Sequence, residues 1–278
     1  MANNDLQFLL SKARQGDVTA LYELASLYQK ENQLDVAFQY AYKGATRYYP
    51  PCERKLAYFY ERGIGTDINY KMAIHYYNLA IGHGDIPSIA NLGLLYYKGL
   101  GVEKDDKKAF ELVEEAAKKN HVKAISTLAR FYHLGIGVPV DDKKYFELLN
   151  EARRLGERNI FHLLGLCYYN GVGVEQDYLE AHKCFLAGSE EGDYECFYYL
   201  GVMLVAGEGV EKDYSRAFYY YQQGAKNDDP RAMYNLALFY ENGVYVPKNI
   251  DMVTYWLKLA SEKGFMPAKE KLKQYQDL

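Results

Sequence analysis

The sequence predicts an all-α solenoid of about seven helix-hairpin repeats between half-repeat caps. The first observation is a glycine that recurs every 36 residues, at Gly63, Gly99, Gly135, Gly171, Gly207 and Gly243. The second is a leucine seven residues before each glycine, at Leu56, Leu92, Leu128, Leu164, Leu200 and Leu236. A fixed period of this length is the signature of stacked helical repeats, in which each repeat buries its apolar face against its neighbours.

Within one repeat, the residues predict two helices joined by a short loop. Leu92, Leu95 and Tyr96 recur at steps of three and four, which is one face of a helix. Gly99 ends that helix, because glycine favours the left-handed position after a helix. Asp105 is then placed to cap the next helix, and its loss is expected to cost about 1 kcal/mol.

The two ends are variants of this repeat. Residues 1–16 match the end of a second helix and predict an N-terminal cap helix. Residues 17–51 predict a divergent repeat whose loop is four residues shorter, residues 52–268 predict six 36-residue repeats, and residues 269–278 predict a C-terminal cap helix. Because each repeat of a solenoid contacts its neighbours in turn, we expect one solenoid over residues 1–278.

Composition excludes several classes of protein. The net charge of −4 gives no general attraction to nucleic acid, and no apolar run approaches the roughly 18 residues of a membrane span. No secretory signal is recognisable at the N-terminus, and the four cysteines lack metal-ligand spacing. We therefore expect a monomer that is cytoplasmic, or exported as an effector without an N-terminal signal peptide, with no membrane insertion.

The sequence offers no recognisable catalytic site. Its six histidines are scattered, no serine or cysteine nucleophile stands beside a base in a known motif, and no cofactor is indicated. The Gly-x-Gly loops lack the preceding strand and the following basic residue of a phosphate-binding loop. We interpret these loops as turns and expect a protein that is not an enzyme.

The stretch Asn91-Leu92-Gly93-Leu94-Leu95-Tyr96-Tyr97-Lys98-Gly99-Leu100-Gly101-Val102 resembles the Sel-1-like repeat (SLR) family. The resemblance covers residues 52–268 strongly and 17–51 weakly. It implies right-handed superhelices that act as adaptors, assembling protein complexes or engaging host proteins when bacteria make them. Two alternatives stay open: an SLR-type enzyme or enzyme activator, and a pentatricopeptide-like RNA binder.

One SLR subgroup is secreted, rich in cysteine and linked to β-lactam binding. In that subgroup a disulfide joins the end of one second helix to the start of the next first helix. The matching positions in this sequence include Ser189 with Phe197 and Ala225 with Met233, and none of these four residues is a cysteine. The resemblance therefore gives no support for a secreted, disulfide-braced enzyme.

The resemblance also predicts where a partner protein or peptide binds. In tetratricopeptide-like superhelices the first helix of each pair lines a concave groove, which we expect to be basic and polar near the N-terminus and apolar further on. The candidate groove residues are Arg54, Tyr58, Asn91, Leu94, Tyr97, Lys123, Arg130, His133, His162, Leu166, Tyr169, Tyr198, Val202, Val205, Tyr234 and Leu238. A bound peptide would place an acidic end near Arg54 and Arg130 and apolar residues over Tyr169, Val202 and Leu238.

Two cysteines predict a further contact. Cys167 and Cys184 occupy positions that hold large apolar side chains in other repeats, and those positions are expected to face each other across a helix hairpin. Two readings remain open: ordinary thiols whose neighbours fill the space, or a redox pair that forms a conditional disulfide.

Overall fold

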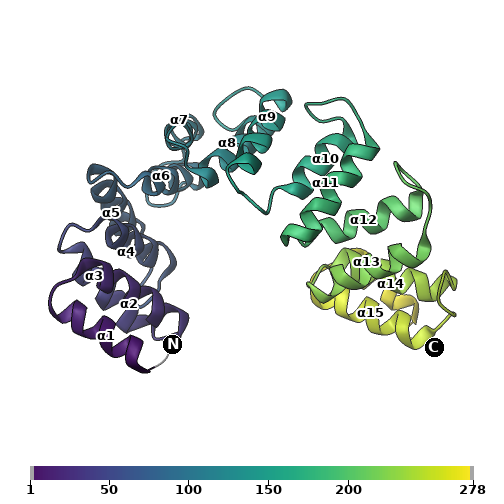
Figure 1. Ribbon diagram of the computed structural model, residues 1–278, viewed down its shortest axis with the longest axis horizontal. Helices are drawn as coiled ribbons and strands as arrows, with labels where there is room; N and C mark the ends of the chain where they lie inside the picture. Colours follow the sequence, from purple (N-terminus) through teal and green to yellow (C-terminus); the bar gives the residue numbers. More distant parts are fainter. Residues whose placement is uncertain (1–2, 276–278) are drawn as a thin grey trace. The chain divides into compact units, whose positions relative to one another are not determined.

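The computed structural model describes residues 3–275, and this part of the chain contains α-helices, one short 3-10 helix and no strand (Figure 1). The all-α prediction is therefore confirmed. In order, the helices are α1 (Asn3–Arg14), α2 (Val18–Lys30), α3 (Leu34–Ala45), α4 (Pro50–Arg62), α5 (Tyr70–Gly82), α6 (Ile86–Lys98), α7 (Asp106–Lys118), α8 (Val122–Leu134), α9 (Asp142–Arg154), α10 (Phe161–Asn170), α11 (Tyr178–Glu191), α12 (Glu195–Ala206), α13 (Tyr214–Lys226), α14 (Pro230–Asn242), α15 (Ile250–Glu262), α16 (Met266–Leu272) and the 3-10 helix η1 (Lys273–Tyr275).

The helices fall into two compact units, which meet in the sequence between Val140 and Asp141. The first unit contains α1, three hairpins from α2 to α7, and α8. The second contains α9, three hairpins from α10 to α15, and α16. Helix α16 begins at Met266, earlier than the cap expected over residues 269–278, because Pro267 is accommodated in its first turn. Residues 1–2 and 276–278 of the two expected caps lie outside the described residues.

The loop inside each hairpin is built as the sequence predicts. Gly171 ends α10 with φ of 71°, and its backbone N–H donates to the carbonyl of Cys167. Asp177 then caps α11, accepting a hydrogen bond from the backbone N–H of Glu180 at 3.0 Å. The equivalent caps, each accepting from the backbone N–H three residues on, are Asn69, Asp105, Asp141, Asp213 and Asn249.

The second glycine of each loop is required for a close approach between repeats. At Gly209 the φ angle is 70°, and an added Cβ atom would lie 2.6 Å from the backbone of Tyr178 at the start of α11. Each loop therefore packs on the second helix of the preceding pair, and a side chain there would push the two apart. Tyr245, which replaces this glycine in the last repeat, keeps a positive φ of 63°.

Leucines and small residues form the core between helices. Leu56, Leu164, Leu200 and Leu236 are at most 1% exposed. The small residue after each leucine lets the paired helix approach: a Cβ atom on Gly201 would lie 2.5 Å from the ring of Tyr221 on α13. A small side chain at this position therefore allows the two helices of a hairpin to pack closely.

Most hairpins carry an aromatic ring on the second helix that packs against a tyrosine of the next pair. Phe38, Phe110, Phe146 and Phe218 meet Tyr60, Tyr132, Tyr168 and Tyr240 nearly edge to face, at 5.3, 5.5, 5.3 and 5.8 Å between ring centroids. His182 takes this position on α11, and the tyrosine position opposite is Leu204. His182 is only 9% exposed, and its Nε2 atom has no hydrogen-bond partner.

The first helices form the inner layer of each unit. In the first unit α2 contacts α4, and in the second α10 contacts α12 and α12 contacts α14. We call the side of each unit that the first helices line its inner face.

Candidate functional site

On the inner face of the first unit, the charge of Arg54 is neutralised by an aspartate of the chain itself. Arg54 on α4 was expected to point into a groove, but its Nη1 atom lies 2.7 Å from the carboxylate of Asp85. Asp85 is 8% exposed and also caps α6 by accepting from the backbone N–H and the hydroxyl of Ser88. Arg54 therefore joins two hairpins through this ion pair, and its binding of an acidic group of a ligand stays a prediction.

The next residue, Lys55, has different surroundings. Its Nζ atom donates to the neutral side chain of Gln29 at 3.1 Å and lies over the rings of Tyr22 and Phe59, at 5.2 and 5.5 Å from their centroids. Lys55 is half-buried, and burial lowers the pKa of its ammonium. It is a desolvated cation on the inner face, held by aromatic rings and one amide.

Beside Lys55, helix α2 borders a pocket of about 590 Å³. Tyr22, whose ring lies under the Lys55 ammonium, forms part of its wall. The remaining lining comes from the same helix: Glu23, Ser26, Leu27, Lys30 and Glu31. The pocket has room for one or two side chains of a bound segment.

The other expected groove residues of the first unit vary in exposure. Tyr58 is 38% exposed and lies under the guanidinium of Arg62 at 5.8 Å. Tyr97 is half-buried and packs against the ring of Phe131 at 5.5 Å. Asn91 and Leu94 are half-buried, whereas Lys123, Arg130 and His133 on α8 are exposed.

In the second unit, His162 repeats the arrangement of Arg54. Its Nδ1 atom lies 2.8 Å from the carboxylate of Asp193, which is 2% exposed and also accepts from the His162 backbone N–H. His162 therefore joins α10 to Asp193, just before α12, and its role in binding a partner stays a prediction.

The remaining expected residues of the second unit form an apolar row. Leu166 on α10, Val202 on α12 and Leu238 on α14 occupy one repeated position and are all half-buried. Val205 and Tyr234 lie beside them, also half-buried and packed on buried core residues. We call Leu166, Val202 and Leu238 the apolar row.

Tyr169 borders the apolar row and is tied to the next repeat. Its hydroxyl donates to the carboxylate of Glu208 at 2.5 Å, and its ring meets Tyr178 edge to face. Burial, followed by the hydrogen bond to Glu208, raises the pKa of Tyr169 to about 12. The Tyr169 hydroxyl therefore stays protonated at neutral pH and can keep donating to Glu208.

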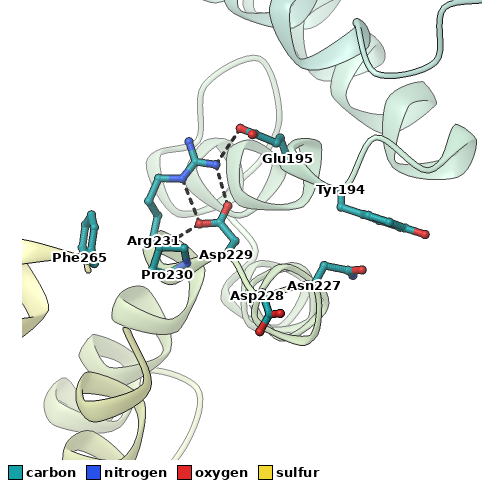
Figure 2. Close-up of a pocket in the computed structure, with 8 residues that line it drawn as sticks. All are labelled: Tyr194, Glu195, Asn227, Asp228, Asp229, Pro230, Arg231 and Phe265. Atoms are coloured by element: carbon teal, nitrogen blue, oxygen red, sulfur yellow. Dashed lines mark hydrogen bonds and ion pairs between the residues drawn. The ribbon is translucent and has the colours of Figure 1, made fainter. Parts of the chain in front are cut away.

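Sequence reasoning missed an arginine cluster near the start of α14. Figure 2 shows the Arg231 guanidinium between Asp229 and Glu195, at 2.7 and 3.0 Å from their carboxylates. The same guanidinium lies 4.4 Å from the ring centroid of Tyr198, a residue that was expected to line the groove. Every charged group at the centre of the cluster thus has a partner, and its role is to join two hairpins. The acidic cap followed by arginine in Asp229-Pro230-Arg231 was the available signal.

This cluster borders a pocket of about 460 Å³ at the edge of the second unit. Tyr194 and Phe265 lie on opposite sides of it in Figure 2, and Asn227, Asp228 and Pro230 complete the wall. Asp228 is paired with Lys263 at 2.8 Å. The acidic side chains on its wall are thus paired within the chain, Asp229 and Glu195 with Arg231 and Asp228 with Lys263.

The cysteines are free thiols. Burial raises the pKa of Cys167 to about 12 and also raises that of Cys184, so neither is a reactive thiolate at neutral pH. A helix end and the next helix start meet at Gly188 and Cys196, where a Cβ atom on the glycine would lie 2.5 Å from the sulfur. This contact is one residue earlier than the Ser189 and Phe197 positions expected from the sequence.

Among residues 3–275 no group of three or more histidine, cysteine, aspartate or glutamate side chains is arranged to hold a metal ion. Nor does any helix in this part of the chain have the length and apolar character needed to cross a membrane.

The Sel1 repeat family model matches residues 50–85, 86–121, 122–157, 162–193, 198–229 and 230–265, which is more than half of the chain. The chain belongs to the Sel1 repeat family. Each matched segment covers one first helix, the Gly-x-Gly loop and the following second helix. No curated protein matches the sequence.

Solved Sel1 proteins share the fold. A Sel1 repeat protein from Oxalobacter formigenes is 28% identical with a TM-score of 0.76, over 86% of this chain and 96% of that one. A protective antigen of uropathogenic Escherichia coli that displays an SLR fold is 26% identical with a TM-score of 0.77, over 96% of this chain. This chain spans 58% of the length of that antigen. An immunity protein from Pseudomonas aeruginosa shares the fold alone. It is 18% identical with a TM-score of 0.52, over 77% of this chain and 80% of that one.

Proposed function

We propose that this Sel1 repeat protein is a non-enzymatic scaffold that binds a partner protein or peptide on the inner face of its first helices. Sel1 repeats commonly mediate protein–protein interactions, which supports the general role. We further propose that it acts as a monomer in the cytoplasm, a reducing compartment consistent with its free cysteines. The proposal for the inner face depends on the geometry of the second unit.

The observation that carries this proposal is the apolar row. Leu166, Val202 and Leu238 lie 36 residues apart on three consecutive first helices, so they follow one another along the inner layer of the second unit. Each is half-buried, and each therefore keeps apolar surface that a ligand can cover. Covering the remaining surface of such a side chain contributes on the order of 1 kcal/mol.

The test compares two triple variants with equal changes in charge. Leu166→Asp, Val202→Asp and Leu238→Asp place carboxylates on the apolar row. The control, Leu179→Asp, Tyr219→Asp and Tyr255→Asp, alters second-helix residues that are 51%, 54% and 52% exposed. Circular dichroism checks that both variants keep the helical content of the native protein.

The expected result is a partner that is captured from a lysate of the source organism by the native protein and the control, but not by the inner-face variant. Equal capture by all three folded proteins would refute binding at the apolar row. Capture that is lost only in the control would move the site to the second helices.

A further inference from the structure

Lys55 is unusual among the cations of the first unit because it is half-buried without a carboxylate. Its neighbour Arg54 has Asp85 at 2.7 Å, but no ion pair of the described residues includes Lys55. Its recorded hydrogen bond goes to the amide oxygen of Gln29. A lysine ammonium has three N–H donors, so this bond leaves donors for another acceptor.

The chemical consequence is a site that favours an anion. Burial lowers the pKa of Lys55, because its charged ammonium loses part of its hydration there. The rings of Tyr22 and Phe59 offset part of the lost hydration, but a ring provides less stabilisation than a carboxylate. A carboxylate from outside would meet a partly dehydrated cation, where charge-assisted hydrogen bonds are strong.

The surroundings leave room for that carboxylate. The pocket of about 590 Å³ on α2 shares Tyr22 with the Lys55 site. Glu23 and Glu31 also border this pocket, but both are exposed, so water screens their charges more than that of the half-buried lysine. Lys30 on the same wall adds exposed positive charge beside the pocket.

We propose that Lys55 anchors an aspartate or glutamate side chain of the partner, so that the segment bound on the inner face of the first unit is acidic. The proposal rests on the proposed function and names the chemistry of its ligand. A single ammonium recognises charge without a fixed fork geometry, which suits a mobile side-chain carboxylate. This proposal places the acidic anchor at the residue adjacent to Arg54.

A binding role predicts an unusual combination of effects on substitution. Lys55→Met keeps the apolar stem between Tyr22 and Phe59 but removes the desolvated charge. If the charge is kept for binding, the variant will unfold at the same or a higher urea concentration than the native protein while losing the ligand. A lysine that only stabilises the fold would give the opposite change in stability.

The experiment measures fluorescence anisotropy of labelled hexaglutamate with an amidated C-terminus. Amidated hexaglutamine is the neutral control, and hexaglutamine with a free C-terminal carboxylate tests the alternative source of the anion. The control variant is Lys71→Met, which makes the same charge change at an exposed lysine on α5.

We expect the native protein and Lys71→Met to bind hexaglutamate, and Lys55→Met to bind it about ten- to a hundredfold more weakly. Equal affinity of the two variants, or no binding to the native protein, would overturn the proposal. Stronger binding of the free-carboxylate hexaglutamine would overturn the choice of a side-chain carboxylate. The apolar row in the second unit is tested separately, so failure here leaves the scaffold proposal intact.

Discussion

Replacing His182 by phenylalanine should stabilise the second unit. His182 occupies a position that holds phenylalanine in four other hairpins, it is 9% exposed, and its Nε2 atom has no hydrogen-bond partner. An unsatisfied buried nitrogen costs about 1–3 kcal/mol. Because Leu204 replaces the usual tyrosine partner, the new ring will lack the edge-to-face contact, and we expect a gain of about 1–2 kcal/mol at neutral pH.

The gain should grow in acid. Burial, followed by the positive charge of Arg216, lowers the pKa of His182 below its usual value. The unfolded chain therefore binds the proton more readily than the folded chain, and the native protein loses stability as the pH falls below about 6.5. His182→Phe removes this loss, so the difference in free energy of unfolding should be larger at about pH 5 than at about pH 7.5.

Urea denaturation followed by tryptophan fluorescence measures this difference directly. The chain has 1 tryptophan, Trp256 on α15, and it reports on the second unit. His75→Phe, the same exchange at an exposed histidine of α5, is the control and should leave the Trp256 transition unchanged. A His182→Phe variant no more stable than the native protein at either pH would refute the reasoning, as would an advantage that shrinks in acid.

Three further outcomes follow from contacts described above. Gly173→Ala should lower the free energy of unfolding of the second unit by more than about 3 kcal/mol, because the added Cβ atom would clash with the backbone at Asp142. Gly156→Ala has open space around its Cβ position and should cost only about 1–2 kcal/mol, the strain of a positive φ. Urea denaturation measures both changes. Arg54→Met should lower the free energy of unfolding by about 2 kcal/mol, because it leaves a buried carboxylate unpaired; an unchanged urea midpoint would contradict that pairing. Cys167, whose pKa burial raises to about 12, should not react with a thiol reagent at about pH 8 until urea unfolds the chain; rapid labelling of the folded protein would contradict this.

The helices could be predicted from the sequence because their signals are local. In the 36-residue repeats, each first helix ends at a glycine with positive φ, and each second helix begins after an aspartate or asparagine whose side chain caps it. Both signals recur at the same spacing, so each repeat supports the interpretation of the others. No such signal marks the boundary between the two units at Val140 and Asp141, because the 36-residue period continues unbroken through Gly135 and Gly171.

The side-chain partners on the inner face could be predicted only in part. Counting from the core leucines selects positions on the first helices, but it could not show that Arg54 and His162 turn toward Asp85 and Asp193. Each of these pairs joins residues 31 apart in neighbouring hairpins, and a partner in the next hairpin is invisible to a pattern within one helix. The same limit explains why Lys55 could not be separated from its charged neighbours before its contacts were known.

The loops inside the helix pairs and the turns between the pairs differ in how tightly they pack, and this difference determines where hairpins can be exchanged. The Gly-x-Gly loops pack on the backbone of the preceding pair, so a crossover there would separate surfaces that fit each other. At the turns between pairs, Gly84, Gly156, Gly192 and Gly264 have open space around their Cβ positions. A hairpin cut at these turns carries a loop that packs on the preceding pair. That contact is with a backbone position that recurs every 36 residues, at Leu34, Tyr70, Asp106, Asp142 and Tyr178, so a moved loop meets the same backbone in its new place. Whole helix hairpins, cut at the turns between pairs, are therefore the units by which the number of repeats and the side chains of the inner face can be changed.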